Sequence, residues 1–304
     1  MPTPGSLAAT VCALVLAPLL LGIVNRTKSF VAGRRGPPVL QLYWDLAKYL
    51  RRGAVYGDTT SWLFRLGPVI GLAAAAAALL VTPFGGIAAP VPFTGDLIVL
   101  AGLLALGRFA TVLAALDTGS SFEGMGASRE MHFAALAEPA LLLALATLAH
   151  ATDCLSLTAI YRAIDAAAWI GALPTFALTA MTLVVLMLVE NTRIPVDDPT
   201  THLELTMIHE VMVLDHSGPD LGYIHYAAAL KFWIVGSLLV GLVVPVRSGD
   251  FWLDLTAMLA GMAGLAVAVG IIESAMARYR LVHVPQFIVG AATLSAVAFI
   301  IRLV

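Results

Sequence analysis

Eight long apolar stretches constrain the fold of this chain more than any other feature. They cover residues 6–25, 62–82, 97–117, 133–150, 169–189, 227–245, 252–272 and 285–302. A helix needs roughly 20 consecutive apolar residues to cross a bilayer. The chain is 12% charged, whereas a soluble domain is about 25% charged. The sequence therefore predicts an all-α integral membrane protein with about eight transmembrane helices, forming a single polytopic domain over residues 1–304.

Positive charge is divided unequally between the two sides of such a bundle. If successive loops alternate sides, most of the 17 Lys and Arg residues fall on one side, in the longer and more polar loops. The other side holds only Arg162, Arg247 and Arg302. Cytoplasmic loops carry the excess of Lys and Arg. We therefore expect polar cytoplasmic loops and both termini on the outer side.

The cysteines and histidines predict that this chain carries no metal. Its two cysteines, Cys12 and Cys154, are fewer than the four that usually hold an iron–sulfur cluster. His202, His209 and His216 are spaced seven residues apart, and two helical turns separate neighbours by about 10.5 Å. That spacing is too long for direct binding of one ion from one helix. Val213 also breaks the zinc-protease pattern that His209 begins.

The segment 39–52 (VLQLYWDLAKYLRR) predicts an amphipathic helix at the membrane surface. Leu42, Leu46 and Leu50 share one apolar face, while Asp45 and Lys48 are spaced to form an ion pair. Aromatic and basic residues suit the boundary between lipid and water. Two interpretations stay open: the helix only seats the protein at this boundary, or it contributes to an interface with a partner.

Several charged residues lie in or beside the apolar stretches. A charge at the bilayer centre costs about 2.5–3.5 kcal/mol on insertion scales, so such residues face a wet cavity, an ion-pair partner or a proton path. The candidates are Arg108 and Glu138 within spans, Asp117, Glu190 and Glu273 at span ends, and Glu123 and Glu130 in the adjacent loop. The alternative for each residue at a span end is simple solvation.

The polar stretch from Glu190 to Asp220 separates two apolar stretches. The helix-start signal DDP (197–199) predicts a helix from about Thr200 to Leu214, with Thr201 and Glu204 in a capping-box pattern. The histidines of this stretch suit hydrogen bonding in a polar interface. A proton-relay role for His202 or His209 is the alternative.

Long motifs in these polar segments resemble one family. They are RRGPPVLQLYWDLAKYLRR (34–52), SSFEGMGASREM (120–131), AEPALL (137–142), ENTRIPVDDPTTHLELTMIHE (190–210) and LDHSGPDLG (214–222). The chain resembles, over nearly its whole length, the membrane heel subunit shared by respiratory complex I and the group 4 nickel–iron hydrogenases of the formate hydrogenlyase and hydrogenase-4 type. Val196 and His202 depart from the complex I motif, and the segment before Gln41 is shorter, so the resemblance does not favour quinone binding.

The resemblance implies a non-catalytic subunit in the inner membrane of a prokaryote. It would dock soluble hydrogenase-like large and small subunits, which carry iron–sulfur clusters and a nickel–iron site, and contact antiporter-like membrane subunits and lipids, but no nucleic acid. It implies an acidic ion path of Glu123, Glu138, Glu190, Asp197, Glu204 and Glu210. It also implies docking or structural roles for Arg34, Arg35, Asp45, Lys48, Arg129, Arg193 and His202.

Two other functions stay open. One is the quinone-site subunit of a complex I-like NADH dehydrogenase. The other is a stand-alone secondary transporter, although the sequence has no internal repeat of the kind that many transporters contain.

Overall fold

The computed structural model describes residues 3–197 and 207–303, and within them every regular element is a helix. Eight helices are long and apolar enough to cross a membrane. They are α1 (Pro4–Val31), α3 (Trp62–Val81), α4 (Asp96–Asp117), α5 (Ser121–Thr152), α8 (Leu173–Glu190), α9 (Gly218–Val243), α10 (Phe251–Ala275) and α11 (Val284–Leu303). Each contains one of the eight predicted stretches or overlaps most of it, so the prediction of a multi-pass, all-α membrane protein is confirmed.

Two of these helices begin well before the apolar stretch that predicted them. α5 starts at Ser121 rather than at residue 133, and α9 starts at Gly218 rather than at residue 227. Glu123, Arg129 and Glu130 therefore lie on α5 and not in a loop. The extra turns of α5 are polar in composition but pack against the chain itself, at residues 208–212, so hydropathy alone did not reveal them.

Short elements connect the long helices. They are α2 (Gln41–Leu50), α6 (Leu157–Ala163), α7 (Ala166–Gly171) and the 3₁₀ helices η1 (Glu210–Val213) and η2 (Leu281–His283). α2 confirms the predicted surface helix, but Asp45 accepts a hydrogen bond from Gln41 at 3.0 Å, and no ion pair joins it to Lys48 in the described part of the chain.

The predicted helix from Thr200 to Leu214 is wrong over its described part, where residues 207–214 contain only η1. One carboxylate oxygen of Asp197 accepts the backbone N–H groups of Ile208 at 3.0 Å and His209 at 3.4 Å. This contact fixes the backbone before η1 in an irregular conformation. Glu204 and His202 lie outside the described residues.

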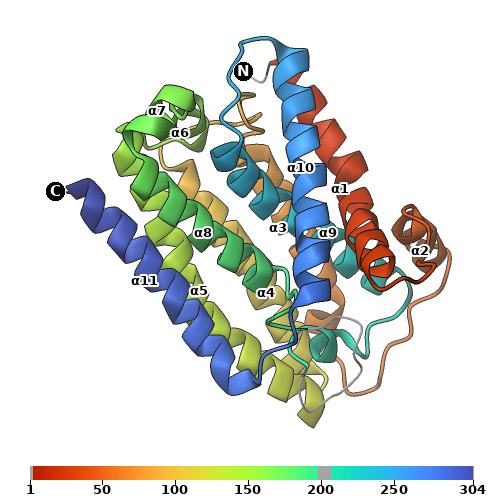
Figure 1. The fold of residues 1–304 in the computed structure, drawn as a ribbon. Coiled ribbons are helices and arrows are strands. Elements are labelled where there is room, and N and C mark those ends of the chain that lie inside the picture. The colour runs from red at the N-terminus through yellow and green to blue at the C-terminus, as the bar shows by residue number, and fades with distance from the viewer. Residues whose placement is uncertain (1–2, 198–206, 304) are drawn as a thin grey trace.

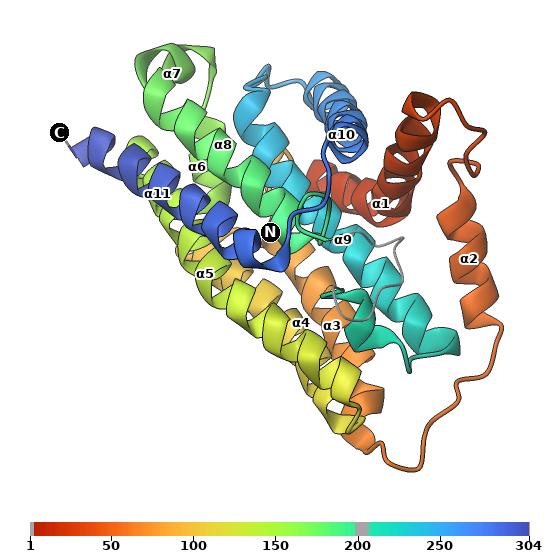
Figure 2. The same ribbon diagram turned by 60° about the horizontal axis from the view of Figure 1, so that its bottom comes forward.

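α9 forms the centre of the bundle (Figures 1 and 2). It contacts α1, α2, α3, α8 and α10, and its Trp233 ring stacks on Phe84 with ring centroids 5.4 Å apart. α5, α8 and α11 pack together on one flank, and α1 packs against α10 on the other. The buried core is therefore continuous from α9 to both flanks.

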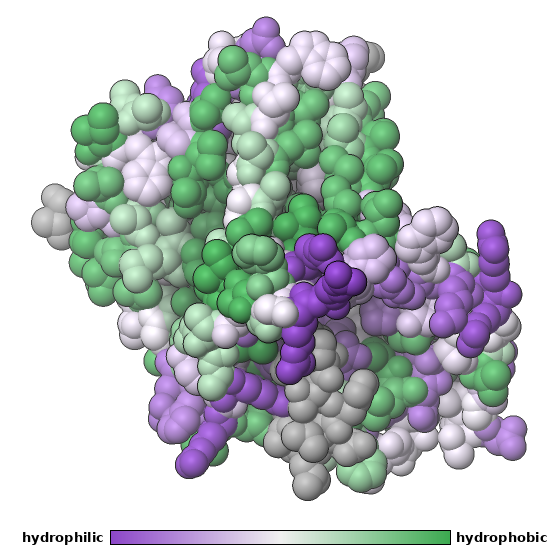
Figure 3. Space-filling model, turned by 45° about the vertical axis from the view of Figure 1, so that its right-hand side comes forward, coloured by the Kyte–Doolittle hydropathy of each residue, from purple (hydrophilic) through white to green (hydrophobic). Residues whose placement is uncertain are grey.

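Polar and apolar surfaces separate along the bundle. Figure 3 shows a mostly hydrophobic surface over the upper part of the molecule and hydrophilic residues gathered in its lower part. The start of α5 lies at the bottom of Figure 1, whereas both chain termini lie in its upper part. Which end faces the cytoplasm stays a prediction from the positive charges.

Candidate functional site: a charged cluster inside the helix bundle

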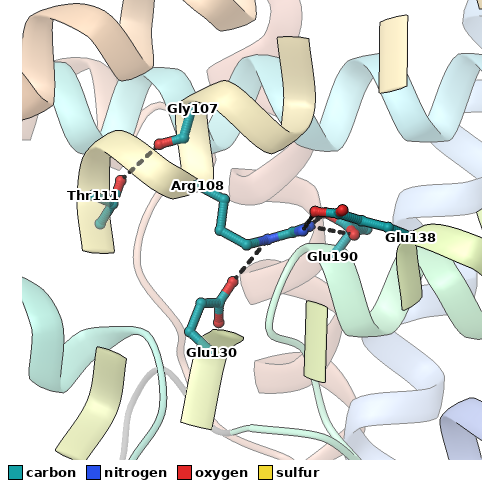
Figure 4. A network of polar contacts seen from close by, with 6 residues as sticks. All are labelled: Gly107, Arg108, Thr111, Glu130, Glu138 and Glu190. Atoms are coloured by element: carbon teal, nitrogen blue, oxygen red, sulfur yellow. Dashed lines mark hydrogen bonds and ion pairs between the residues drawn. The ribbon is translucent and has the colours of Figure 1, made fainter. Parts of the chain in front are cut away.

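Arg108 on α4 is the centre of a cluster of four charged side chains (Figure 4). Its Nη2 atom lies 2.5 Å from both carboxylate oxygens of Glu190, at the end of α8. Its Nε atom lies 3.2 Å from an oxygen of Glu130, and its Nη1 atom contacts Glu138; both acids are on α5. We call Arg108, Glu130, Glu138 and Glu190 the Arg108 cluster.

Most of the Arg108 cluster is withdrawn from the surface. The side chains of Glu190, Arg108 and Glu130 are 2%, 8% and 12% exposed, whereas that of Glu138 is 41% exposed. A charge in such surroundings needs a partner of opposite sign and further hydrogen bonds. Arg108 supplies one guanidinium to three carboxylates, so the cluster joins three helices through one cation and carries an excess of acid.

A second cation, Lys231 on α9, lies near the cluster. It interacts electrostatically with Glu190 and Glu130. Together with Arg108, Glu130 and His209 it lines a cavity of about 70 Å³, which is large enough to hold ordered water. Most of the cavity wall is apolar, from α3, α4 and α9. Water in this cavity would hydrate the cluster within the membrane.

His209 separates this cavity from a larger one. The second cavity is about 260 Å³ and lies between α1, α2, α9 and the loop after α8. His209, Ile224 and Ala228 line both cavities. Burial and the nearby Lys231 lower the pKa of His209 to about 3. The imidazole is therefore neutral at pH 7, which argues against its taking up and releasing protons near neutrality.

Several of the predicted site residues line the larger cavity. Asp45 from α2, Arg193 from the loop after α8, and Glu210 from η1 all line it. These residues come from three separate regions of the sequence. The fold thus brings polar groups of the predicted ion path and of the predicted docking surface to one hollow, at the polar end of the bundle.

Glu123 lies apart from the Arg108 cluster. It is buried at the start of α5, where it accepts the backbone N–H of Asp215 at 3.2 Å. Next to Asp215, the ring of His216 stacks on Phe64 with centroids 3.9 Å apart. Burial lowers the pKa of His216 to about 4. These contacts hold the segment after η1 against α3 and α5.

Asp197 and Arg129 fix the loop between α8 and α9. Asp197 is 1% exposed; it pairs with Arg278 at 2.7 Å and accepts the N–H groups of residues 208 and 209. Arg129 on α5 donates to the carbonyl of Met207 at 2.8 Å. Both residues therefore bind other parts of this chain.

A second set of ion pairs connects α1, α10 and the loop after α8. Glu273 on α10 is fully buried and contacts Lys28 of α1 at 2.8 Å and Arg193 at 3.3 Å. The guanidinium of Arg193 also lies over the ring of Phe232, 5.7 Å from its centroid. By contrast, Arg34, Arg35 and Lys48 are exposed and stay candidates for contact with a partner.

Two of the predicted acids, Glu138 and Glu190, are therefore joined through Arg108. From the sequence alone, Arg108 was evident only as a charge inside a span. Lys231 was missed, although a lysine inside the stretch 227–245 is the same kind of signal. Within residues 3–197 and 207–303, no group of three His, Cys, Asp or Glu side chains is placed to hold a metal ion.

A family model described as NADH dehydrogenase matches residues 5–304. The chain belongs to this NADH dehydrogenase family. Among its relatives in Escherichia coli are formate hydrogenlyase subunit 4, 31% identical over 89% of this chain and 89% of that protein, and hydrogenase-4 component C, 33% identical over 79% of this chain and 75% of that protein. The family resemblance inferred from the motifs is confirmed.

Solved structures support the same fold for this member of the NADH dehydrogenase family. A chain of the membrane-bound sulfane sulfur reductase, an archaeal respiratory membrane complex, superposes with a TM-score of 0.82 at 19% sequence identity. The match covers 98% of both chains. The eight-helix bundle is thus a fold that occurs in respiratory membrane complexes.

Proposed function

We propose that this chain is the membrane-anchoring and coupling subunit of a multisubunit redox complex of the formate hydrogenlyase and hydrogenase-4 type. In this role it docks soluble subunits that carry the iron–sulfur clusters and a nickel–iron site, and it contacts antiporter-like membrane subunits. It takes no catalytic part itself. Its relatives are a subunit of formate hydrogenlyase and a component of hydrogenase-4, and its own cysteines are two free thiols, so the redox centres belong to partners.

The Arg108 cluster is the single observation that carries the coupling part of this proposal. Three carboxylates share one guanidinium inside a membrane bundle, and closely spaced carboxylates raise the free energy of each other's ionised forms. Such a group exchanges protons when the field around it changes. A redox change or a movement at the docked subunits would supply that change through the loop after α8, where the chain continues directly from Glu190.

The larger cavity, at the polar end of the bundle, provides a route for protons or ions to the Arg108 cluster. From the larger cavity, beside Asp45 and Glu210, the path passes His209 and reaches Arg108 and Glu190. Arg34 and Arg35, exposed between α1 and α2, are the proposed contacts for the soluble subunits. The polar end is then the cytoplasmic side of a prokaryotic inner membrane, and both termini face outward.

The test is Glu190→Gln in the whole complex, reconstituted in liposomes. The amide keeps the size of the side chain but holds no exchangeable carboxyl proton. We expect redox activity to continue while ion uptake per turnover is lost, with all subunits retained. Asp58→Asn, at an exposed loop position, is the matched control and should keep wild-type coupling. Full coupling in Glu190→Gln would refute the assigned role.

A quinone-site subunit of a complex I-like dehydrogenase is the second candidate. The observation that favours it is the cavity of about 260 Å³ beside the surface helix α2, because a lipid-soluble ligand would enter from this boundary. Extraction of a stoichiometric quinone from the purified complex would support this function over the first one.

A further inference from the structure

We propose that the outer face of α4 and α5 binds a transmembrane helix of another membrane subunit, and that this helix presents a Lys or Arg side chain to Glu138. The proposal starts from an anomaly in burial. Glu138 is the one member of the Arg108 cluster with a largely exposed side chain, at 41%, and it lies on a helix that is long and apolar enough to cross a membrane.

The depth of Glu138 makes this exposure costly. Arg108, which it contacts, lies 12 residues after the start of α4 and nine before its end, about 18 and 14 Å along the helix. Glu138 itself lies five residues after the start of the apolar stretch 133–150 and 12 before its end. Both residues therefore lie within apolar stretches that are long enough to cross a membrane.

Exposed apolar residues accompany Glu138 on α5 and Arg108 on α4. On α5, Met131 and Leu142 share its helical face and are 44% and 40% exposed. On α4, Leu106 and Phe109 lie near Arg108 in the sequence and are 45% and 51% exposed. Such apolar side chains are ordinary against lipid tails, but the carboxylate of Glu138 is not. Charged groups within spans face the bundle interior, a wet cavity or a partner.

The two cavities that border Arg108 do not extend to Glu138. Among the described residues that line the two cavities bordering Arg108, Glu138 is not found; these cavities are walled mainly by α3, α4, α5, α8, α9 and the loop before α9. The outward side of its carboxylate is therefore available to something outside the chain. A second subunit with an apolar helix face would cover both the acid and the surrounding apolar side chains.

Charge balance specifies the chemistry of that helix. In the described part of the chain the cluster and its neighbour comprise three carboxylates and two cations, Arg108 and Lys231. One carboxylate is in excess, and the exposed one is Glu138. A single Lys or Arg on the partner helix neutralises the excess and gives the outer carboxylate oxygen a charge-assisted hydrogen bond.

This inference rests on the proposed function in one respect, since it needs another membrane subunit in the complex. The test places a photo-crosslinking amino acid at Phe109 and, separately, at Leu142, in the full complex in native membranes. Val297 on α11, apolar and 47% exposed, is the matched control. We expect adducts to one other membrane subunit from positions 109 and 142, with the crosslinked peptide in a helix that contains Lys or Arg.

Several outcomes would overturn the inference. They are crosslinks to lipid only, crosslinks to a second copy of this chain, adducts to a helix without a basic residue, or equal adducts from Val297. Copurification of partners with the wild-type chain is scored separately. If other subunits copurify and no adduct forms, this inference fails while the proposed function stands; if none copurifies, the proposed function itself fails.

Glu138→Leu gives a second, independent test. If Glu138 faces a cation on a partner, the substitution leaves that cation unpaired and weakens retention of the crosslinked subunit by about tenfold or more. The soluble subunits should be retained. If Glu138 faces lipid, leucine suits the site better and the subunit composition is unchanged, which would contradict the proposal.

Discussion

Arg108 contacts both carboxylate oxygens of Glu190 at 2.5 Å, which joins the middle of α4 to the end of α8. The two residues are 82 positions apart in the sequence. Removing one partner of a buried ion pair leaves an uncompensated charge and costs about 3–5 kcal/mol. The pair therefore predicts how substitutions at this place change the stability of the bundle.

Arg108→Ala should strongly destabilise the protein, because three carboxylates would lose their shared cation. We expect a marked fall in the midpoint of thermal unfolding, measured in detergent. Arg162→Ala, at an exposed position, should have little effect. Adding Glu190→Gln to Arg108→Ala should recover part of the loss, since one unpaired charge is removed. Additive losses in the double variant would argue against the pairing.

His216 should make stability depend on pH. Its folded pKa is lowered to about 4 by burial, while the unfolded value is about 6.5. Below pH 6.5 the unfolded chain binds a proton that the folded chain does not, so stability falls as the pH drops from 6.5 to 4, by about 3 kcal/mol in total. Above pH 6.5 the residue contributes no pH dependence.

His216→Phe should reduce this acid sensitivity and preserve the stacking on Phe64. Nδ1 of His216 makes no hydrogen bond within the described part of the chain, so phenylalanine forfeits no bond there. The measurement is the unfolding midpoint at pH 7.5 and pH 5. His132→Phe, at an exposed position, is the control and should behave as wild type. An unchanged acid shift in His216→Phe would refute the assignment.

Glu273 should stabilise the packing of α1, α10 and the loop after α8 through its ion pairs with Lys28 and Arg193. In Glu273→Gln, Lys28 and Arg193 lose their shared carboxylate, and a cost of about 1–3 kcal/mol follows for a buried charged hydrogen bond. Because the carboxylate is fully buried, the effect on the unfolding midpoint should persist at high salt. A loss that disappears at high salt would indicate an exposed pair instead.

Gly126 should be needed for the packing of η1 on α5. A Cβ atom at this position would lie 2.3 Å from Cγ1 of Val211 and 3.0 Å from the carbonyl of Ile208. Gly126→Ala should therefore displace the segment that carries His209, costing about 1–3 kcal/mol. Gly124→Ala is a matched control on the same helix, since its Cβ would meet nothing within 4 Å. Limited proteolysis between α8 and α9 would compare the two variants.

The long helices could be predicted because an apolar stretch long enough to span a bilayer has few alternatives. Their polar ends could not. Residues 121–132 read as a loop by composition, yet they extend α5 because they pack on residues 208–212 of the same chain. The apolar residues of the segment 207–214 have helical spacing. The hydrogen bonds that Asp197 accepts from the backbone of this segment nevertheless hold its start in an irregular conformation.

The candidate site was predictable only in part for a similar reason. Arg108 and Glu138 were evident as charges inside spans, because the cost of such charges marks them. That Arg108 would contact Glu190 and Glu130 as well as Glu138 depends on how α4, α5 and α8 are rotated against one another, which no local pattern specifies. Lys231 completes the group from α9, again through tertiary packing.

The most direct test of the central claim is metal analysis and subunit identification, by mass spectrometry, of the intact complex purified gently through a tag on this chain. The account predicts nickel with abundant iron, together with a large and a small soluble subunit and further membrane subunits. Iron without nickel would indicate a related complex with different redox chemistry, and quinone would then be sought. A folded, membrane-inserted chain that copurifies with neither metal nor soluble partners would contradict the account and favour a stand-alone transporter.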